Sequence, residues 1–549
     1  MREILPYKLF IMLTQKGDFL QIDEPKQMKH YFPHMSLKHT ILPVLLGLLL
    51  VKPVAAEIPS GPISLEQCIK IAIENNLNLR ITSYQPRLAT FSLDGTYSNY
   101  DPNFSVGLSD SHRVSKGRQN PLEFTIPTSE TDSFRHNYGL NGLLPTNTRY
   151  SIGLNGSETT GTSANNFPFG SYGAGFSLRL TQPLLRGAWS GNRVRMNIKL
   201  AKQQVESSGL DVKDQIMQTV GSVERAFYNL IADKQNVTIA EDRLKSAEED
   251  LRIMKIKTNV GTEAKTRLPQ LEAEVYSSQA SLISARNSFT TQVNTLKSLM
   301  SADFASVVDN KLSPVGELNP IQTVFNRNDS WDKALNNRPD IIKSTLSLER
   351  ADIQLKFDKN QLYPQLDLSG SYGLSGSDNA VTAFKDKTPY ISRSATFDNS
   401  FRDIRDGDYP NYSIGLSLNI PIPNRSARAS YKTSLAQKEI ALLQHKRLEQ
   451  TIMINIDSLI RSAESSFERI EATRLARVSG ELAVKNERTL RDEGASTDFV
   501  VLRAERDLTS RRYSEIRAKA DYLISLVALA EAEGSILEKH AINVEFTEE

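Results

Sequence analysis

The chain has 549 residues, and its 66 basic and 64 acidic side chains leave a formal net charge of +2, which does not favour nucleic acid or anionic lipid as a partner. Hydrophobic residues make up 39% of the chain, which excludes an intrinsically disordered protein. Its single cysteine, Cys68, excludes an intrachain disulfide and a cysteine cluster for metal, and packing in the predicted first helix is its expected role.

The first feature along the chain is a short apolar run over residues 41–51. Lys38 precedes this run and the small residues 54–56 follow it, an order typical of a secretory signal peptide cleaved after Ala56. The run is too short to cross a bilayer as a helix. Residues 1–34 are polar and mixed, whereas Met35 opens a normal signal-peptide start. We therefore predict a leader with a signal peptide over residues 1–56. A separate hypothesis is that translation begins at Met35, which would exclude residues 1–34 from the protein.

A repeated sequence follows the leader. Residues 64–98 are expected to form a helix, which Ser64 and Gln67 begin as a capping box. Part of this helix, residues 72–79, recurs as residues 334–341 at an offset of 262 residues. Each copy leads from a helix into strands and then into a long helical segment. We predict a duplicated unit, with repeat 1 over 57–315 and repeat 2 over 316–549.

The hydrophobic period changes from helical to alternating after Asp101-Pro102. Strands are predicted around 104–108 and 176–182, with a hairpin at 134–157, and the second copy has strands at 366–374 and 412–420. Polar loops are predicted at 114–132, 156–172 and 375–411. Apolar residues on one face and small or polar residues on the other fit a membrane barrel wall, although a soluble sandwich alternates in the same way. The hairpin at 134–157 has no counterpart in the second copy, and either an extension of the barrel or a fold over its mouth fits it.

Long helices follow each set of strands. No proline occurs between Pro183 and Pro269 or after Pro423, and a helix from Gly187 to Gly261 would be about 110 Å long. Glycine turns at Gly261 and Gly494 interrupt the two helical segments. Each is followed by a Leu-x-Ala-Glu sequence, at 271–274 and 502–505, that is expected to start the returning helix. Each repeat should therefore hold a hairpin of two long antiparallel helices.

Together these features resemble the TolC-like outer membrane factor family. The matching parts are paired Ala-x-x-Asn helices at 72–75 and 334–337, the strand entries Asp101-Pro102 and Tyr363-Pro364, residues 182–187 and the two glycine turns, within about residues 62–535. The resemblance implies a mainly α fold with a β-barrel portion, in which a homotrimer forms a 12-stranded barrel in outer membrane lipid on a helical periplasmic tunnel. Each chain would give four strands, which cannot close a barrel alone.

The resemblance also implies where partners bind. In this family the glycine turns meet a periplasmic adaptor protein, and the corresponding residues here are Val260, Gly261, Thr262, Gly494 and Ala495. The second turn departs from the family motif, and both glycines would also simply supply a positive φ. A gate region is expected at Asp498, Val500 and Arg503. The family often has acidic residues at the last two positions, so an acidic ring is in doubt here, and Arg503 would pair with Asp498 or Glu505 or face solvent.

No catalytic, cofactor-binding or metal-binding residues are expected. The sequence contains no His-Glu-x-x-His, Gly-x-Ser-x-Gly or P-loop motif, so we do not expect an enzyme. The predicted function is the outer membrane exit duct of a tripartite efflux pump or type I secretion system, joined through the adaptor to an inner-membrane RND or ABC pump, with no nucleic acid partner and an open substrate class. The alternative is a secreted coiled-coil scaffold or adhesin with no transport role.

Overall fold

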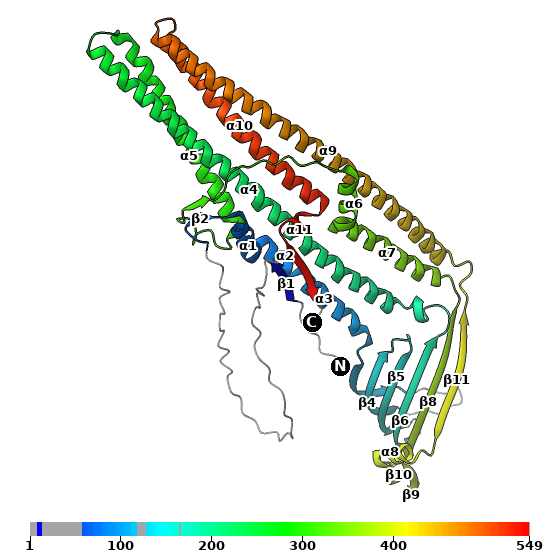
Figure 1. Ribbon diagram of the computed structural model, residues 1–549. Coiled ribbons are helices and arrows are strands. Elements are labelled where there is room, and N and C mark those ends of the chain that lie inside the picture. Colours follow the sequence, from blue (N-terminus) through cyan, green and yellow to red (C-terminus); the bar gives the residue numbers. More distant parts are fainter. Residues whose placement is uncertain (1–7, 14–57, 118–127, 164–165, 548–549) are drawn as a thin grey trace. The chain divides into compact units, whose positions relative to one another are not determined.

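The computed structural model describes residues 8–13, 58–117, 128–163 and 166–547. Contacts divide the chain into two compact units. The helical unit consists of Met1–Arg87, Ser207–Ser344 and His445–Glu549, and the sheet unit consists of Leu88–Glu206 and Thr345–Gln444. Each unit takes segments from both halves of the sequence (Figure 1). The predicted signal peptide lies outside the described residues, so the leader over 1–56 and the repeat boundaries stay predictions.

Three helices replace the single helix expected over residues 64–98: α1 (Leu65–Asn75), α2 (Leu77–Ser83) and α3 (Gln85–Tyr97), followed by the 3-10 turn η1 (Ser98–Tyr100). The capping box is confirmed, because Gln67 N donates to Ser64 Oγ at 3.3 Å and Ser64 N donates to Gln67 Oε1 at 3.1 Å. The first break occurs at Asn76, whose side-chain oxygen accepts from Leu79 N at 3.1 Å and caps α2. The second copy is likewise broken, into α6 (Arg327–Asn337) and α7 (Pro339–Asn360).

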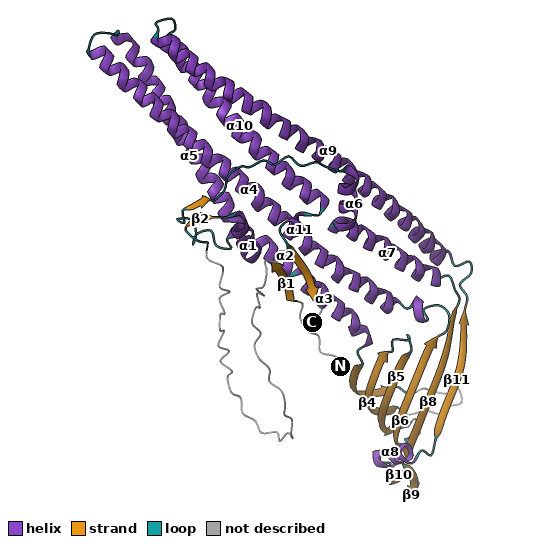
Figure 2. Cartoon of the chain, in the orientation of Figure 1, coloured by secondary structure: helices purple, strands orange, loops and turns teal. Residues whose placement is uncertain are grey.

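Two hairpins of long helices are present, as predicted. The first pairs α4 (Arg193–Asn259) with α5 (Leu268–Met300), and the second pairs α9 (Arg425–Asp492) with α10 (Asp498–Glu533) (Figure 2). The 67 residues of α4 correspond to about 100 Å at the helical rise. Among the described residues, no helix is both long enough and apolar enough to span a membrane.

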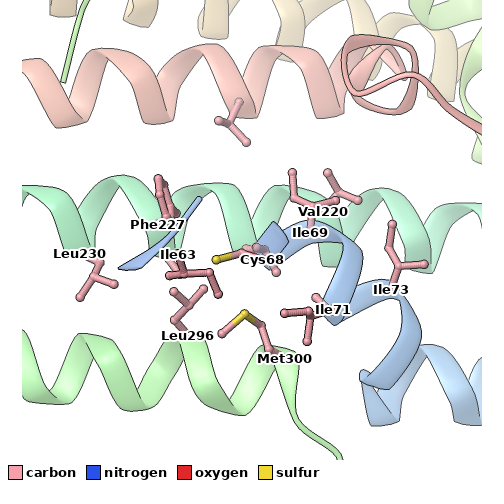
Figure 3. Packing of buried hydrophobic residues seen from close by; sticks show 14 of the residues in the cluster. Ile63, Cys68, Ile69, Ile71, Ile73, Val220, Phe227, Leu230, Leu296 and Met300 are labelled. Carbon is pink, nitrogen blue, oxygen red and sulfur yellow. The ribbon is translucent and has the colours of Figure 1, made fainter. Parts of the chain in front are cut away.

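The main core of the helical unit lies between α1, α4 and α5. Figure 3 shows Cys68 of α1 among Phe227 of α4 and Leu296 and Met300 of α5. Cys68 is fully buried, so it serves in packing as expected, and burial raises the pKa of its thiol to about 12. Short elements surround this core: β2 (Gly61–Ile63) pairs with β7 (Leu312–Pro314), β1 (Lys8–Leu13) pairs with β12 (Ile542–Thr547), and α11 (Ile536–Lys539) buries Ile536.

The sheet unit contains a six-stranded antiparallel sheet. Its strands are β3 (Asn103–Ser115), β4 (Ser129–Leu143), β5 (Arg149–Thr162), β6 (Pro168–Pro183), β8 (Gln365–Asn379) and β11 (Pro410–Asn419), adjacent in that order. The expected number was four. The hairpin predicted at 134–157 accounts for the difference, because its two strands, β4 and β5, lie between β3 and β6.

The predicted polar loops are shorter than the sequence indicated. Strand β5 continues to Thr162 and β6 begins at Pro168, within the loop expected at 156–172, and β4 begins at Ser129 within 114–132. Strand propensity depends on context, and segments rich in serine, threonine and glycine can form strands when they have a neighbouring strand on each side. The composition of these segments therefore predicted loops where the strands continue. The loop expected at 375–411 contains β9 (Val381–Lys385), β10 (Thr388–Arg393) and α8 (Phe397–Asp406).

Candidate functional site at the hairpin turns

Both helical hairpins of the helical unit turn at a left-handed glycine. Gly261 has a φ of +82° and Gly494 a φ of +78°. After α4, Thr262 N donates to Lys257 O at 3.0 Å, while Gly261 N donates to Thr258 O at 3.2 Å. These two bonds form a Schellman motif, which satisfies carbonyl groups at the end of a helix and requires the glycine conformation.

The second turn repeats this geometry with a different sequence. After α9, Ala495 N donates to Leu490 O at 2.8 Å and Gly494 N donates to Arg491 O at 3.0 Å. The bonds involve only backbone atoms, so Ala495 closes this turn as well as Thr262 closes the first. The departure from the family motif at the second turn therefore leaves its backbone shape unchanged.

The five residues expected at the tips are all exposed in this chain. Val260 is an apolar residue at the first turn and is 73% exposed. An added Cβ at either glycine would meet no atom within 4 Å, so each turn presents an open backbone surface. The structure therefore places Val260, Gly261, Thr262, Gly494 and Ala495 where a partner could reach them.

The predicted gate residues lie at the start of α10. Asp498 Oδ2 lies 3.5 Å from Arg267 Nη1, which belongs to η3 (Lys265–Arg267) of the other hairpin. Asp498 Oδ1 also lies 3.9 Å from Arg491 Nη1. Val500 and Arg503 are exposed. Among the described residues no ion pair joins Arg503 to Asp498 or Glu505, and these carboxylates contact other arginines.

A buried ion-pair cluster, missed in the sequence, joins the two hairpins farther from the tips. Its members are Arg243 of α4, Glu274 of α5, Arg488 of α9, and Glu505 and Arg506 of α10. Arg243 contacts Glu274 at 2.5 Å through Nη2 and Glu505 through Nη1. Arg506 Nε donates to Glu274 Oε2 at 2.8 Å, and Arg488 Nη2 donates to Glu505 Oε1 at 2.6 Å. The cluster thus connects all four long helices.

Arg243 and Glu274, at the buried centre of the cluster, hold their charges although they are buried. Burial alone would raise the pKa of Glu274, whose side chain is 3% exposed, but the hydrogen bonds and charges of Arg506 and Arg243 outweigh burial and lower that pKa. Burial would lower the pKa of Arg243, and Glu274 and Glu505 reverse this effect and raise it. Removing one partner would leave a buried charge without compensation, a costly state.

The two Leu-x-Ala-Glu sequences could have indicated this cluster, because their glutamates, Glu274 and Glu505, are both members of it. They were expected to begin helices, but α5 begins at Leu268 and α10 at Asp498, so both sequences lie inside a helix. Proline near the start of α5 and Asp498 in the first turn of α10 suit the earlier starts. Within each sequence the leucine is buried, in contact with Met254, and the glutamate joins the ion pairs.

Comparison with known proteins identifies the family. The sequence model of the family described as "Outer membrane efflux protein" matches residues 147–302 and 331–535, which is more than half of the chain. A curated relative, outer membrane efflux protein BepC from Brucella suis biovar 1 (strain 1330), is 22% identical over 351 residues, covering 63% of this chain and 70% of its own length.

Solved structures share the fold. A membrane protein from Pseudomonas aeruginosa superposes with a TM-score of 0.61 at 17% identity, over 85% of this chain and 90% of that protein. The Campylobacter jejuni CmeC outer membrane channel gives a TM-score of 0.59 at 17% identity, over 86% of this chain and 85% of that channel. These likenesses confirm the predicted mainly α fold with a β-sheet portion.

The family consists of efflux channels and not of enzymes. In these channels an outer membrane part continues into a periplasmic helical part. Such a channel is the exit duct of an efflux system, which agrees with the predicted function and location. Because the family model matches residues 147–302 and 331–535, this chain belongs to the outer membrane efflux protein family.

Proposed function

We propose that this outer membrane channel works as a homotrimer that receives its substrate from a periplasmic adaptor protein, and through it from an inner-membrane RND or ABC pump. The observation that carries the proposal is the pair of exposed Schellman turns, which close the two long hairpins of one unit. A substrate would move passively through the channel. Energy for transport would come from the pump.

The sheet supports assembly from several copies. Within the described residues, β3 and β11 are the edges of the six-stranded sheet, and each has a neighbour on one side only. Open edges are not tolerated in lipid, because unpaired backbone groups cannot bond to water there. Further copies of the chain would satisfy these groups and leave a hollow interior.

The hairpin turns are the proposed adaptor site. Val260, Gly261, Thr262, Gly494 and Ala495 form two exposed surfaces of similar backbone shape. An adaptor that recognises backbone and small side chains could bind both turns in an equivalent way. The two hairpins would then offer six contact points around a trimer.

The ion pairs near the tips support a gate. Arg267 and Asp498 join the first hairpin to the second at the turns, and the buried ion-pair cluster joins them farther along the helices. Moving one hairpin away from the other requires both sets of ion pairs to separate. We infer that Asp498, Val500 and Arg503 border the opening that an adaptor widens.

Transport and adaptor contact can be tested together in the native cell. Deleting the gene should raise the accumulation of a fluorescent efflux dye, and the wild-type gene should restore export. Thr262→Asp should fail to restore it, whereas Thr290→Asp should succeed, because Thr290 is also exposed but lies on α5 away from the turns. Equal transport by the two variants would refute the adaptor site.

The scaffold alternative has its own test. A secreted coiled-coil scaffold would leave membranes when washed with high salt, whereas the proposed channel would need detergent. Unchanged dye accumulation after deletion, together with extraction by salt, would refute the channel and favour the scaffold.

A further inference from the structure

The inserted hairpin β4–β5 is a full part of the sheet. Strand β4 pairs with β3 from Asn103–Asn141 to Ser115–Ser129, and β5 pairs with β6 from Arg149–Thr181 to Thr162–Pro168. A hairpin folded over the mouth of a barrel would pair with the wall at most at one end. Instead, both of its strands keep a neighbour along their whole length.

One face of the sheet has two neighbouring rows that are apolar across all six strands. Residues opposite one another on antiparallel strands share a face, so the register defines rows. One such row contains Phe104, Leu140, Ile152, Leu178, Tyr372 and Tyr412. The next row contains Val106, Tyr138, Leu154, Phe176, Leu374 and Pro410. The inserted strands supply two apolar members to each row.

The other face carries small and polar side chains. The row that alternates with these two contains Ser105, Gly139, Gly153, Ser177, Gly373 and Asn411. Apolar residues on one face and polar residues on the other are the pattern of a wall between lipid and a water-filled lumen. Strands β4 and β5 follow this pattern in phase with their neighbours, as lipid-facing wall strands must.

Helix α8 contacts both the inserted hairpin and the neighbouring strand β6. The ring of Phe397 lies 5.1 Å from that of His136 on β4, and a Cβ added to Gly156 of β5 would lie 2.7 Å from Phe397. The same helix bonds to β6, where Ser400 Oγ donates to Tyr172 O at 2.9 Å. Inserted and neighbouring strands are therefore held as one surface.

We propose that three copies of this chain close an eighteen-stranded wall, three times the six strands of one sheet, in place of the twelve strands that the family resemblance implied. The proposal rests on the trimer of the proposed function. The partner at each open edge is a second copy: β3 of one chain pairs with β11 of the next. Because six is an even number, these edge strands run in opposite directions, and their pairing continues the antiparallel sheet.

The edge strands have the side chains that such a join requires. Phe104 of β3 is 66% exposed and Tyr412 of β11 is 80% exposed, and both belong to the same apolar row. Joining the edges would place the apolar side chains of one chain beside those of the next, in a register that is staggered by the shear of the barrel. The diameter of a barrel grows roughly in proportion to its strand number, so the bore would be about 1.5 times as wide as in a twelve-stranded wall.

Cysteine pairs can report which strands are neighbours in the full-length protein in its membrane. Native Cys68 does not interfere, because it is buried. Ser111→Cys with Ser133→Cys should form a disulfide between β3 and β4, and Ser151→Cys with Arg179→Cys should form one between β5 and β6. Ser105→Cys with Ser177→Cys should not react within a chain, because two strands separate them by about 14 Å at the usual strand spacing.

Pairs across the edges count the chains. Ser105→Cys on β3, combined in turn with Ser413→Cys and Ser417→Cys on β11, should give a covalent ladder ending at three chains in at least one combination. These residues lie on the polar face, so the apolar face stays intact. Dye export by each variant is measured in the same cells, with each single-cysteine variant as its control.

The outcomes separate strand number from function. Disulfides at β3–β4 and β5–β6 with a three-chain ladder support eighteen strands. A disulfide between Ser105→Cys and Ser177→Cys within one chain overturns the proposal, since the hairpin would then lie outside the wall. A ladder ending at two chains also overturns it, as two copies would give twelve strands. If export is absent while the three-chain ladder forms, the transport role fails and the strand number stands.

Discussion

Breaking the buried ion-pair cluster should destabilise the helical unit. Arg243→Leu removes the side chain that contacts both Glu274 and Glu505. The two carboxylates are 3% and 5% exposed, so their remaining charge cannot be compensated by water. Removing one partner of a fully buried pair costs about 3–5 kcal/mol. Because Arg506 and Arg488 stay bound to the carboxylates, we expect the lower end, about 3 kcal/mol.

The matched control lies on the same helix. Arg252 forms an ion pair with Glu249 at 2.6 Å, but the two side chains are 63% and 51% exposed. An exposed pair of this kind contributes about 0–1 kcal/mol, so Arg252→Leu should change stability little. Both substitutions replace an arginine of α4 with leucine, so helix propensity is matched.

Thermal unfolding followed by the helical circular dichroism signal in detergent measures the difference. Since 1 kcal/mol shifts the midpoint by about 2–4 °C in domains of 150–250 residues and by less in larger ones, Arg243→Leu should lower the midpoint by about 4–8 °C relative to Arg252→Leu. Adding Glu505→Leu to Arg243→Leu should recover part of the loss, because it removes a buried charge. Equal midpoints for the two single variants, or a double variant that is additive, would refute the role of the cluster.

Three further predictions concern the turns, acid and helix α8. Gly261→Ala should cost about 1–2 kcal/mol, because alanine resists the left-handed conformation, whereas Gly95→Ala, in open space within α3, should be neutral or stabilising; chemical denaturation compares them. The pKa of Glu274 is lower in the folded state than its unfolded value near 4.3. The stability that ionised Glu274 contributes should therefore be complete above about pH 4.3 and lost as the pH falls through the folded pKa. Glu274→Gln lacks this carboxylate, so its free energy of unfolding should fall less steeply below about pH 4 than that of the wild type. Gly376→Ala should detach α8, because the new Cβ would collide with Ser400 O, and limited proteolysis within residues 397–406 should become faster than in the wild type.

Local patterns predicted most of the helical architecture. Long periodic segments with no proline in the helix interior, separated by glycine turns, were sufficient to predict α4, α5, α9 and α10, because helices and Schellman turns depend on neighbours within a few residues. The alternation of the strands was also visible. The alternation did not predict the order of the strands in the sheet. A hairpin with alternating apolar residues has the same sequence pattern whether it lies in the wall or forms a separate flap.

The buried ion-pair cluster was beyond local patterns for a different reason. Its five charged residues come from four helices and span positions 243 to 506. On a charged helix surface each of them is typical of a solvated side chain, and only the packing of the two hairpins buries Arg243, Glu274 and Glu505. The single clue was the recurrence of Glu274 and Glu505 after identical Leu-x-Ala residues, which marks equivalent positions in the two copies.

The duplication explains why the cluster depends on both copies while the turns tolerate divergence. Glu274 of the first hairpin binds Arg506 of the second, and Glu505 of the second binds Arg243 of the first. Each carboxylate therefore needs a guanidinium from the opposite copy, and losing either glutamate leaves charges buried on both hairpins. Both turns close through the same pair of backbone hydrogen bonds, and the first adds a bond from Thr262 Oγ1 to Lys257 O at 2.9 Å. Ala495 lacks this hydroxyl but keeps the backbone bonds, so the second turn has the same shape. The side chains of the second turn can therefore change without altering the turn, whereas a change at either glutamate disrupts ion pairs with the opposite hairpin.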